Sequence, residues 1–206
     1  MRNKNKKPIT KHIYENNSVI KTERTLIIGR SGCGKTFLML SILKDKNPDD
    51  VYIICKTDNQ YPSNFHNQSS EILPLEDYEN KTIVFDDMLG SKEAKDIDGF
   101  FTPGRHQNLD IYYISQSWYE LPKNTIRNNC SRIMLFPQTL KDITMIYNDI
   151  SGLHMSFLEW RDFCRDAWKK KYNYIQIDKD KDLDDMYSIK NVSGLEITAI
   201  PETDAF

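Results

Sequence analysis

Long apolar segments are the first feature that this 206-residue sequence lacks. No run approaches the roughly 18 apolar residues that a membrane-spanning helix requires. The first residues are basic, but no apolar segment of the kind found in secretory signals follows them. The sequence therefore predicts neither a membrane span nor a secretion signal.

Cysteine and histidine are also scarce, with four of each in the chain. They are Cys33, Cys55, Cys130 and Cys164, and His12, His66, His106 and His154. Neither type recurs at the short spacing of a disulfide framework or a metal site. The thiols fit a reducing compartment, and we expect no zinc site.

The chain also lacks an overall excess of basic charge, since its formal net charge is −2. The charge is nevertheless uneven: residues 1–12 are basic and contain no acidic side chain, whereas residues 178–185 contain five aspartates. Charged ends of this kind are commonly solvated tails, and a basic one can also bind nucleic acid. We predict a polar basic arm over residues 1–20, one folded domain over 21–180 and an irregular acidic tail over 181–206.

The most informative motif that the chain does contain is a complete G-x-x-x-x-G-K-[ST] phosphate-binding loop. Its residues are Gly29, Arg30, Ser31, Gly32, Cys33, Gly34, Lys35 and Thr36. An apolar run precedes the loop and a helix-like run follows it, which is the context that the motif needs. The glycines and the helix start direct N–H groups at phosphates, Lys35 reaches the β- and γ-phosphates, and the Thr36 hydroxyl binds Mg²⁺. The sequence thus predicts ATP and Mg²⁺ as cofactors.

Apolar, β-branched runs alternate with helical patterns along the chain. Strands are expected at 24–28, 51–55, 82–85, 111–114, 133–136 and 172–177, the last perhaps on a sheet edge, and helices at about 35–44, 91–101, 122–129, 139–149 and 155–168. The connection 57–80 and the last 25 or so residues show no clear period. This alternation predicts an α/β fold with a mostly parallel sheet flanked by helices on both faces.

A second motif follows the third expected strand, which ends in Asp86 and Asp87. An apolar strand that ends in carboxylates resembles a Walker B motif, although many buried strands end in aspartate. Asp86 would then bind Mg²⁺, and Asp87 would orient or deprotonate the attacking water. One strand lies between the two motif strands along the chain, as in RecA-like P-loop NTPases of the additional-strand, catalytic-carboxylate type. Gln116 follows the next expected strand, and the resemblance to that branch implies that Gln116 senses the γ-phosphate.

A further ordered series then resembles the genome-packaging ATPases of large DNA viruses and virophages, the poxvirus-type branch of the FtsK–HerA superfamily. The series comprises Gly104-Arg105-His106, Ser115-Gln116-Ser117, Leu121-Pro122 and Ile126-Arg127-Asn128-Asn129. The resemblance covers about residues 24–136. It departs from the wider superfamily at Asp87, where a glutamate is common.

The resemblance implies a homo-oligomeric ring, a pentamer or hexamer, around double-stranded DNA. In such a ring a neighbouring subunit supplies an arginine to each ATP site, here Arg105 or Arg127. The predicted function is an ATPase that packages a viral genome into a preformed capsid. Its expected partners are DNA and the viral capsid protein, and its expected location is the host cytoplasm or viral factory, with virion association as an option. The alternatives are a nucleoside or nucleotide kinase and a non-motor nucleotide switch in assembly.

Overall fold

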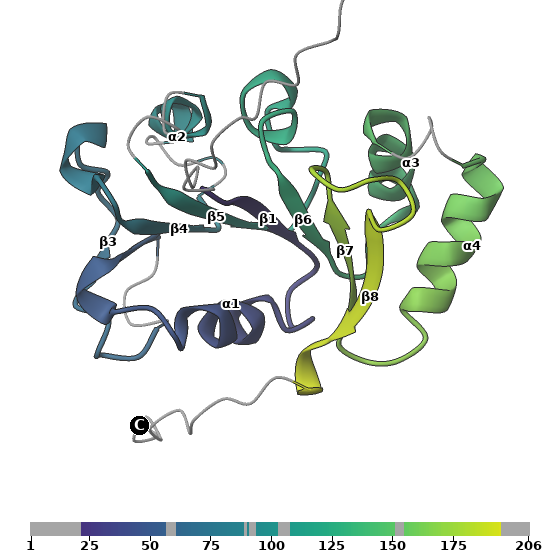
Figure 1. Cartoon of the computed structure of the whole chain (residues 1–206), viewed down its shortest axis with the longest axis horizontal. Coiled ribbons are helices and arrows are strands. Elements are labelled where there is room, and N and C mark those ends of the chain that lie inside the picture. Colours follow the sequence, from purple (N-terminus) through teal and green to yellow (C-terminus); the bar gives the residue numbers. More distant parts are fainter. Residues whose placement is uncertain are drawn as a thin grey trace, which may run out of the picture.

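The computed structural model describes residues 22–56, 61–88, 90, 94–102, 108–150 and 155–194. The strands in these residues form one eight-stranded sheet in the order β3-β2-β4-β5-β1-β6-β7-β8 (Figure 1). They are β1 (Arg24–Ile28), β2 (Val51–Cys55), β3 (Asn67–Ser69), β4 (Thr82–Asp86), β5 (Asp110–Ser115), β6 (Arg132–Leu135), β7 (Asn173–Asp178) and β8 (Tyr187–Asn191). The first six are parallel, whereas β7 is antiparallel to β6 and β8 is antiparallel to β7.

Helices cover both faces of the sheet, which explains why the central strands are continuous apolar runs. The helix α1 (Lys35–Leu43) lies on one face, and α2 (Ala94–Phe101), α3 (Leu140–Asp149) and α4 (Phe157–Ala167) lie on the other (Figure 1). Alternate residues of β1 enter different clusters: Ile27 packs with α1, whereas Leu26 and Ile28 pack on the opposite face. Both faces of this strand therefore contribute to the core.

Local chemistry sets several helix boundaries. The side chain of Thr139 accepts a hydrogen bond from the backbone N–H of Asp142 at the start of α3, and Ser156 and Glu159 form a capping box at the start of α4. Short helical turns complete the structure. They are η1 (Pro48–Asp50), η2 (Leu75–Tyr78), the π-helical η4 (Lys123–Arg127) and η6 (Val192–Gly194).

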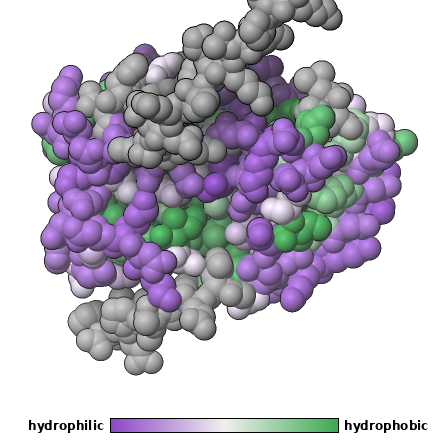
Figure 2. All heavy atoms as spheres, in the orientation of Figure 1, coloured by the Kyte–Doolittle hydropathy of each residue, from purple (hydrophilic) through white to green (hydrophobic). Residues whose placement is uncertain are grey.

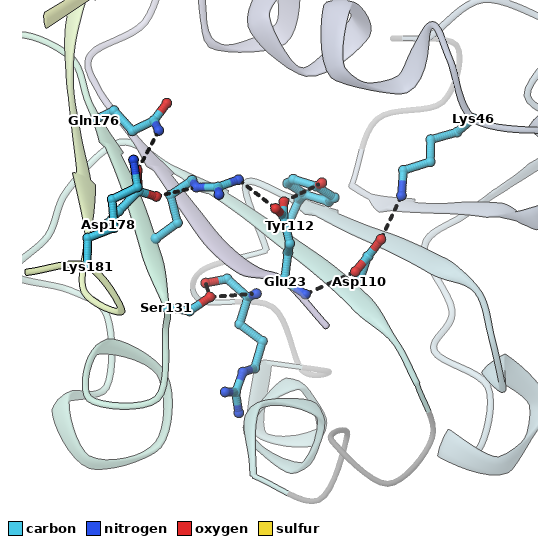
Figure 3. Close-up of polar contacts among 10 residues, drawn as sticks. Glu23, Lys46, Asp110, Tyr112, Ser131, Gln176, Asp178 and Lys181 are labelled. Carbon is cyan, nitrogen blue, oxygen red and sulfur yellow. Dashed lines mark hydrogen bonds and ion pairs between the residues drawn. The ribbon is translucent and has the colours of Figure 1, made fainter. Parts of the chain in front are cut away.

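A polar network joins the amino-terminal ends of β1, β5 and β6 (Figure 3). Arg132 donates to Glu23 at 2.7 Å and to Asp178 at 2.6 Å, and Lys46 donates to Asp110 at 2.6 Å. Asp178 is buried, but its partner Arg132 and the pair Lys46–Asp110 are only partly buried. Ion pairs that stay in contact with solvent contribute little free energy. The network lies at the amino-terminal edge of the parallel strands. Ligands of open α/β sheets bind at the other edge, outside the carboxyl ends of the strands.

The structure confirms the predicted α/β class and each predicted strand to within about a residue. In the sheet, β5 lies between β1 and β4. The strands that carry the two phosphate-site motifs are thus separated by one strand, as the additional-strand type requires.

Two predictions of irregular structure are wrong in part. Residues 67–69 form β3 and 75–78 form η2 inside the 57–80 connection, and residues 187–191 of the predicted irregular tail form β8. Both strands are short and polar, and both gain order by pairing with a buried neighbour rather than from an apolar pattern of their own. Because β8 pairs with β7, β7 is not on the sheet edge. The rest of the arm–domain–tail division stays a prediction, and residues 1–21 lie outside the described residues.

Candidate active site

The phosphate-binding loop connects β1 to α1 at the carboxyl edge of the sheet. A Cβ atom on Gly29 would lie 2.5 Å from Cβ of Phe136, so only glycine fits beside this neighbour. Gly34 has φ 105°, a left-handed conformation that favours glycine, and it is the N-cap of α1 without any side-chain cap. The first N–H groups of α1 therefore have no side-chain partner at this end, which suits a phosphate anion.

Lys35 extends back across the loop. Its ammonium group donates hydrogen bonds to the carbonyl oxygens of Gly29 at 2.7 Å and Arg30 at 3.0 Å. The positive charge is thereby held inside the curve of the loop, where the β- and γ-phosphates of a nucleotide bind in this motif.

Asp86, the last residue of β4, aligns with Ile114 of β5, while Ser115 of β5 aligns with Ile28 at the end of β1. Strand register thus brings Asp86 to the edge that carries the loop. Asp86 is buried, with 7% of its surface exposed. Burial raises the pKa of the Asp86 carboxyl, and the nearby charge of Lys35 acts in the opposite direction.

Asp87 and Gln116 meet at the same edge, where both are exposed. Asp87 has a left-handed backbone with φ 52°, and its N–H donates to the carbonyl oxygen of Ile114 at 3.1 Å. The amide of Gln116 donates to Oδ2 of Asp87 at 3.3 Å. A carboxylate and an amide side by side, both open to solvent, can position a water molecule.

These groups line one cavity of about 570 Å³. Its lining includes Ser31, Gly32, Gly34, Lys35, Thr36, Asp86, Asp87 and Gln116 from the predicted site. It also includes Phe37, Tyr172, Val192 and Ser193, which the sequence did not indicate. Tyr172 directly precedes β7, and Val192 and Ser193 belong to η6, directly after β8. The ring of Tyr172 would lie 3.4 Å from a Cβ atom on Gly34. The carboxy-terminal hairpin therefore forms a wall of the cavity beside the phosphate loop.

The oxygen groups at this site suit Mg²⁺. Thr36 and Asp86 offer a hydroxyl and a carboxylate, both hard ligands. Among the described residues, no group of three or more histidine, cysteine, aspartate or glutamate side chains could hold a metal. Mg²⁺ usually keeps several waters and takes the rest of its ligands from one or two carboxylates and substrate phosphates, so a site with this donor set fits.

The two candidate arginines differ in what the structure shows. Arg127 is 7% exposed, donates to Oδ2 of Asp149 at 2.5 Å, and lies over the ring of Trp118, which is fully buried. Lys123 also contacts Asp149, at 2.8 Å. These contacts engage the Arg127 guanidinium within its own chain, away from the lining of the cavity. Arg105 and His106 lie outside the described residues.

Comparison with known proteins adds information only at the level of structure. No protein-family model matches the chain, and no curated protein matches it. The genome-packaging NTPase B204 of Sulfolobus turreted icosahedral virus 2, in complex with AMPPCP, is similar in structure. The TM-score is 0.59 at 16% identity, over 82% of this chain and 98% of that one. The complex of the same protein with ATP-gammaS gives a TM-score of 0.58 at 14% identity, over 83% and 98% of the two chains. B204, the DNA-packaging ATPase of Sulfolobus turreted icosahedral virus, gives 0.57 at 15% identity, over 81% and 96%.

At this level of identity the likeness establishes a shared fold, which is the fold that the sequence resemblance implies. One further finding concerns membranes. In the part of the chain that the structure describes, no helix is both long enough and apolar enough to cross a bilayer.

Proposed function

We propose that this chain is an ATP-hydrolysing motor that moves double-stranded DNA and packages a viral genome into a preformed capsid. The observation that carries the proposal is the cavity that joins the phosphate loop to Asp86, Asp87 and Gln116 in one site. Support for DNA as the load comes from the shared fold with proteins named as genome-packaging NTPases.

The chemistry follows from the positions of the side chains. Lys35 and the N–H groups at the start of α1 would hold the phosphates, and Thr36 and Asp86 would hold Mg²⁺. When bound, the cation would neutralise part of the charge that develops on the phosphates. Asp87, fixed by its hydrogen bond to Gln116, would orient the attacking water and accept its proton.

The exposure of Asp87 and Gln116 supports a site that is completed by another subunit. Arg105 is our candidate for the arginine that crosses the interface, because Arg127 is engaged within its own chain. An arginine supplied in trans stabilises the charge of the transferred phosphoryl group. We propose a homo-oligomeric ring of five or six subunits that works with the capsid protein in the infected cell.

The sheet order weighs against the simple kinase alternative, because β5 separates the two motif strands. The product of the reaction distinguishes the two functions. A motor releases phosphate to water, whereas a kinase transfers it to a nucleoside or nucleotide.

Stimulation by DNA tests the proposal. We expect linear duplex DNA to raise steady-state ATP turnover several-fold, irrespective of its sequence. A motor that holds DNA by its backbone contacts phosphates, which are the same in every sequence. The DNA concentration for half-maximal stimulation should increase steeply with salt, as counterion release requires. Phosphate release is measured over a salt series, with mixed-sequence duplexes of equal length as the matched substrates. Turnover that never responds to DNA, or phosphate transferred to a nucleoside, would contradict the proposal.

A further inference from the structure

Tyr61 belongs to the connection between β2 and β4, and its hydroxyl reaches the nucleotide site. The phenol donates a hydrogen bond to Oδ2 of Asp86 at 2.7 Å. Both residues are buried, at 4% and 7% exposure. Tyr61 therefore contacts the carboxylate that we assign to Mg²⁺, although neither sequence motif contains it.

The position of Tyr61 is fixed by a small substructure around β3. The amide nitrogen of Gln68 in β3 lies within hydrogen-bond distance of three carbonyl oxygens, those of Tyr61 at 3.4 Å, Pro62 at 3.2 Å and Phe65 at 2.9 Å, and its two hydrogens are shared among them. The rings of Tyr61 and Phe65 enter the hydrophobic cluster on the α1 face of the sheet. Since β3 is held by parallel pairing with β2, the turn that carries Tyr61 is attached to the main sheet.

The hydrogen bond restricts the Asp86 carboxylate. A donor on Oδ2 opposes rotation of the carboxylate and satisfies one oxygen, so Oδ1 is left for the cation or a water bound to it. The phenol is a hydrogen-bond donor at neutral pH, and its only role toward Asp86 in this contact is to donate. A hydrogen bond to a carboxylate is among the stronger kinds in proteins.

We propose that Tyr61 is a positioning residue that holds the Asp86 carboxylate in the orientation that binds hydrated Mg²⁺. The inference rests on the proposed function and goes beyond it, because it makes the edge strand β3 and its turn part of the metal site. If Asp86 only satisfies a buried hydroxyl, removal of that hydroxyl should leave the Mg²⁺ dependence of ATP turnover unchanged.

The test is Tyr61→Phe, which removes one oxygen and retains the ring. ATP turnover is measured at saturating ATP while free Mg²⁺ is varied. We expect the Mg²⁺ concentration for half-maximal turnover to rise on the order of tenfold, the scale of a lost charge-assisted hydrogen bond. Binding of a fluorescent ADP analogue in EDTA should stay within about twofold of the wild type, because the phosphate loop is unchanged.

Tyr78→Phe is the matched control. Tyr78 is also buried, and its hydroxyl accepts a hydrogen bond from the backbone N–H of Leu73, remote from the lining of the site. This variant should lower the thermal unfolding temperature without changing the Mg²⁺ dependence.

The outcomes separate the two proposals. If the wild type hydrolyses ATP and Tyr61→Phe has the wild-type Mg²⁺ dependence, or shows only the loss of stability seen for Tyr78→Phe, the inference on Tyr61 is overturned and the proposed function stands. A wild type without Mg²⁺-dependent turnover overturns the proposed function and the inference with it.

Discussion

Lys35→Ala is expected to abolish measurable ATP turnover while the fold survives. The ammonium group is held over the phosphate loop by the carbonyl oxygens of Gly29 and Arg30. Because it would bear directly on the β- and γ-phosphates, its loss removes charge stabilisation in the transition state. Removal of one such preorganised group costs on the order of 100- to 1000-fold in rate. Phosphate release measures the effect, and circular dichroism with thermal unfolding measures the fold.

Lys95→Ala is the control for this variant. Lys95 is an exposed lysine of α2, on the other face of the sheet from α1. Its replacement removes the same charge from the chain without touching the cavity, so turnover should stay near the wild-type rate. Retained turnover in Lys35→Ala would show that the nucleotide site is wrongly assigned.

Asp87→Asn is expected to separate ATP binding from ATP hydrolysis. The amide has nearly the shape of the carboxylate and leaves the loop, Thr36 and Asp86 in place, but it accepts no proton from the attacking water. General base catalysis contributes on the order of 100- to 10,000-fold, and a loss of this size in the rate of a single turnover is the expected result. The dissociation constant for ATP should change little.

Rapid-mixing measurement of phosphate release, together with equilibrium binding of ATP, resolves the two quantities. Asp45→Asn changes an exposed aspartate just beyond α1 and serves as the charge-matched control. Hydrolysis at the wild-type rate in Asp87→Asn would exclude Asp87 as the base. A loss of binding together with hydrolysis would instead make it a group that holds the nucleotide.

The parts of the candidate site whose chemistry is local could be predicted from the sequence. The loop from Gly29 to Thr36 has a fixed spacing, and Asp86 and Asp87 follow an apolar run directly, so residue types and their order identify both motifs. The α/β class followed in the same way, since buried parallel strands must be apolar on both faces. In the view of Figure 2, hydrophilic residues dominate the surface, and hydrophobic ones show in small groups near the centre and on the right side of that face.

The remaining parts depend on contacts between segments that are distant in sequence. Tyr172, Val192 and Ser193 reach the cavity only because β7 and β8 fold back beside the loop. β8 itself escaped prediction because Ile189 is 47% exposed and the strand has no buried apolar alternation. Tyr61 lies in a polar connection, 25 residues before the aspartate that it contacts.

The environment of Arg127 also depends on a contact between segments that are distant in sequence. The short segment around it resembles a family motif, and that similarity supported a role between subunits. Its partner Asp149 lies 22 residues further along the chain, in a helix whose relation to Arg127 no local pattern reveals. Only the folded structure shows that this guanidinium is buried against its own chain.

Movement along DNA is the most direct test of the motor itself. A duplex that carries a third strand, bound as a triplex at one end, is incubated with the wild-type chain, ATP and Mg²⁺, and release of the third strand is followed by fluorescence. The account predicts release that requires ATP, slows as salt weakens the grip on DNA phosphates, and is absent for Lys35→Ala. A wild-type protein that hydrolyses ATP on the same duplex, yet releases no third strand at any salt concentration, would contradict it.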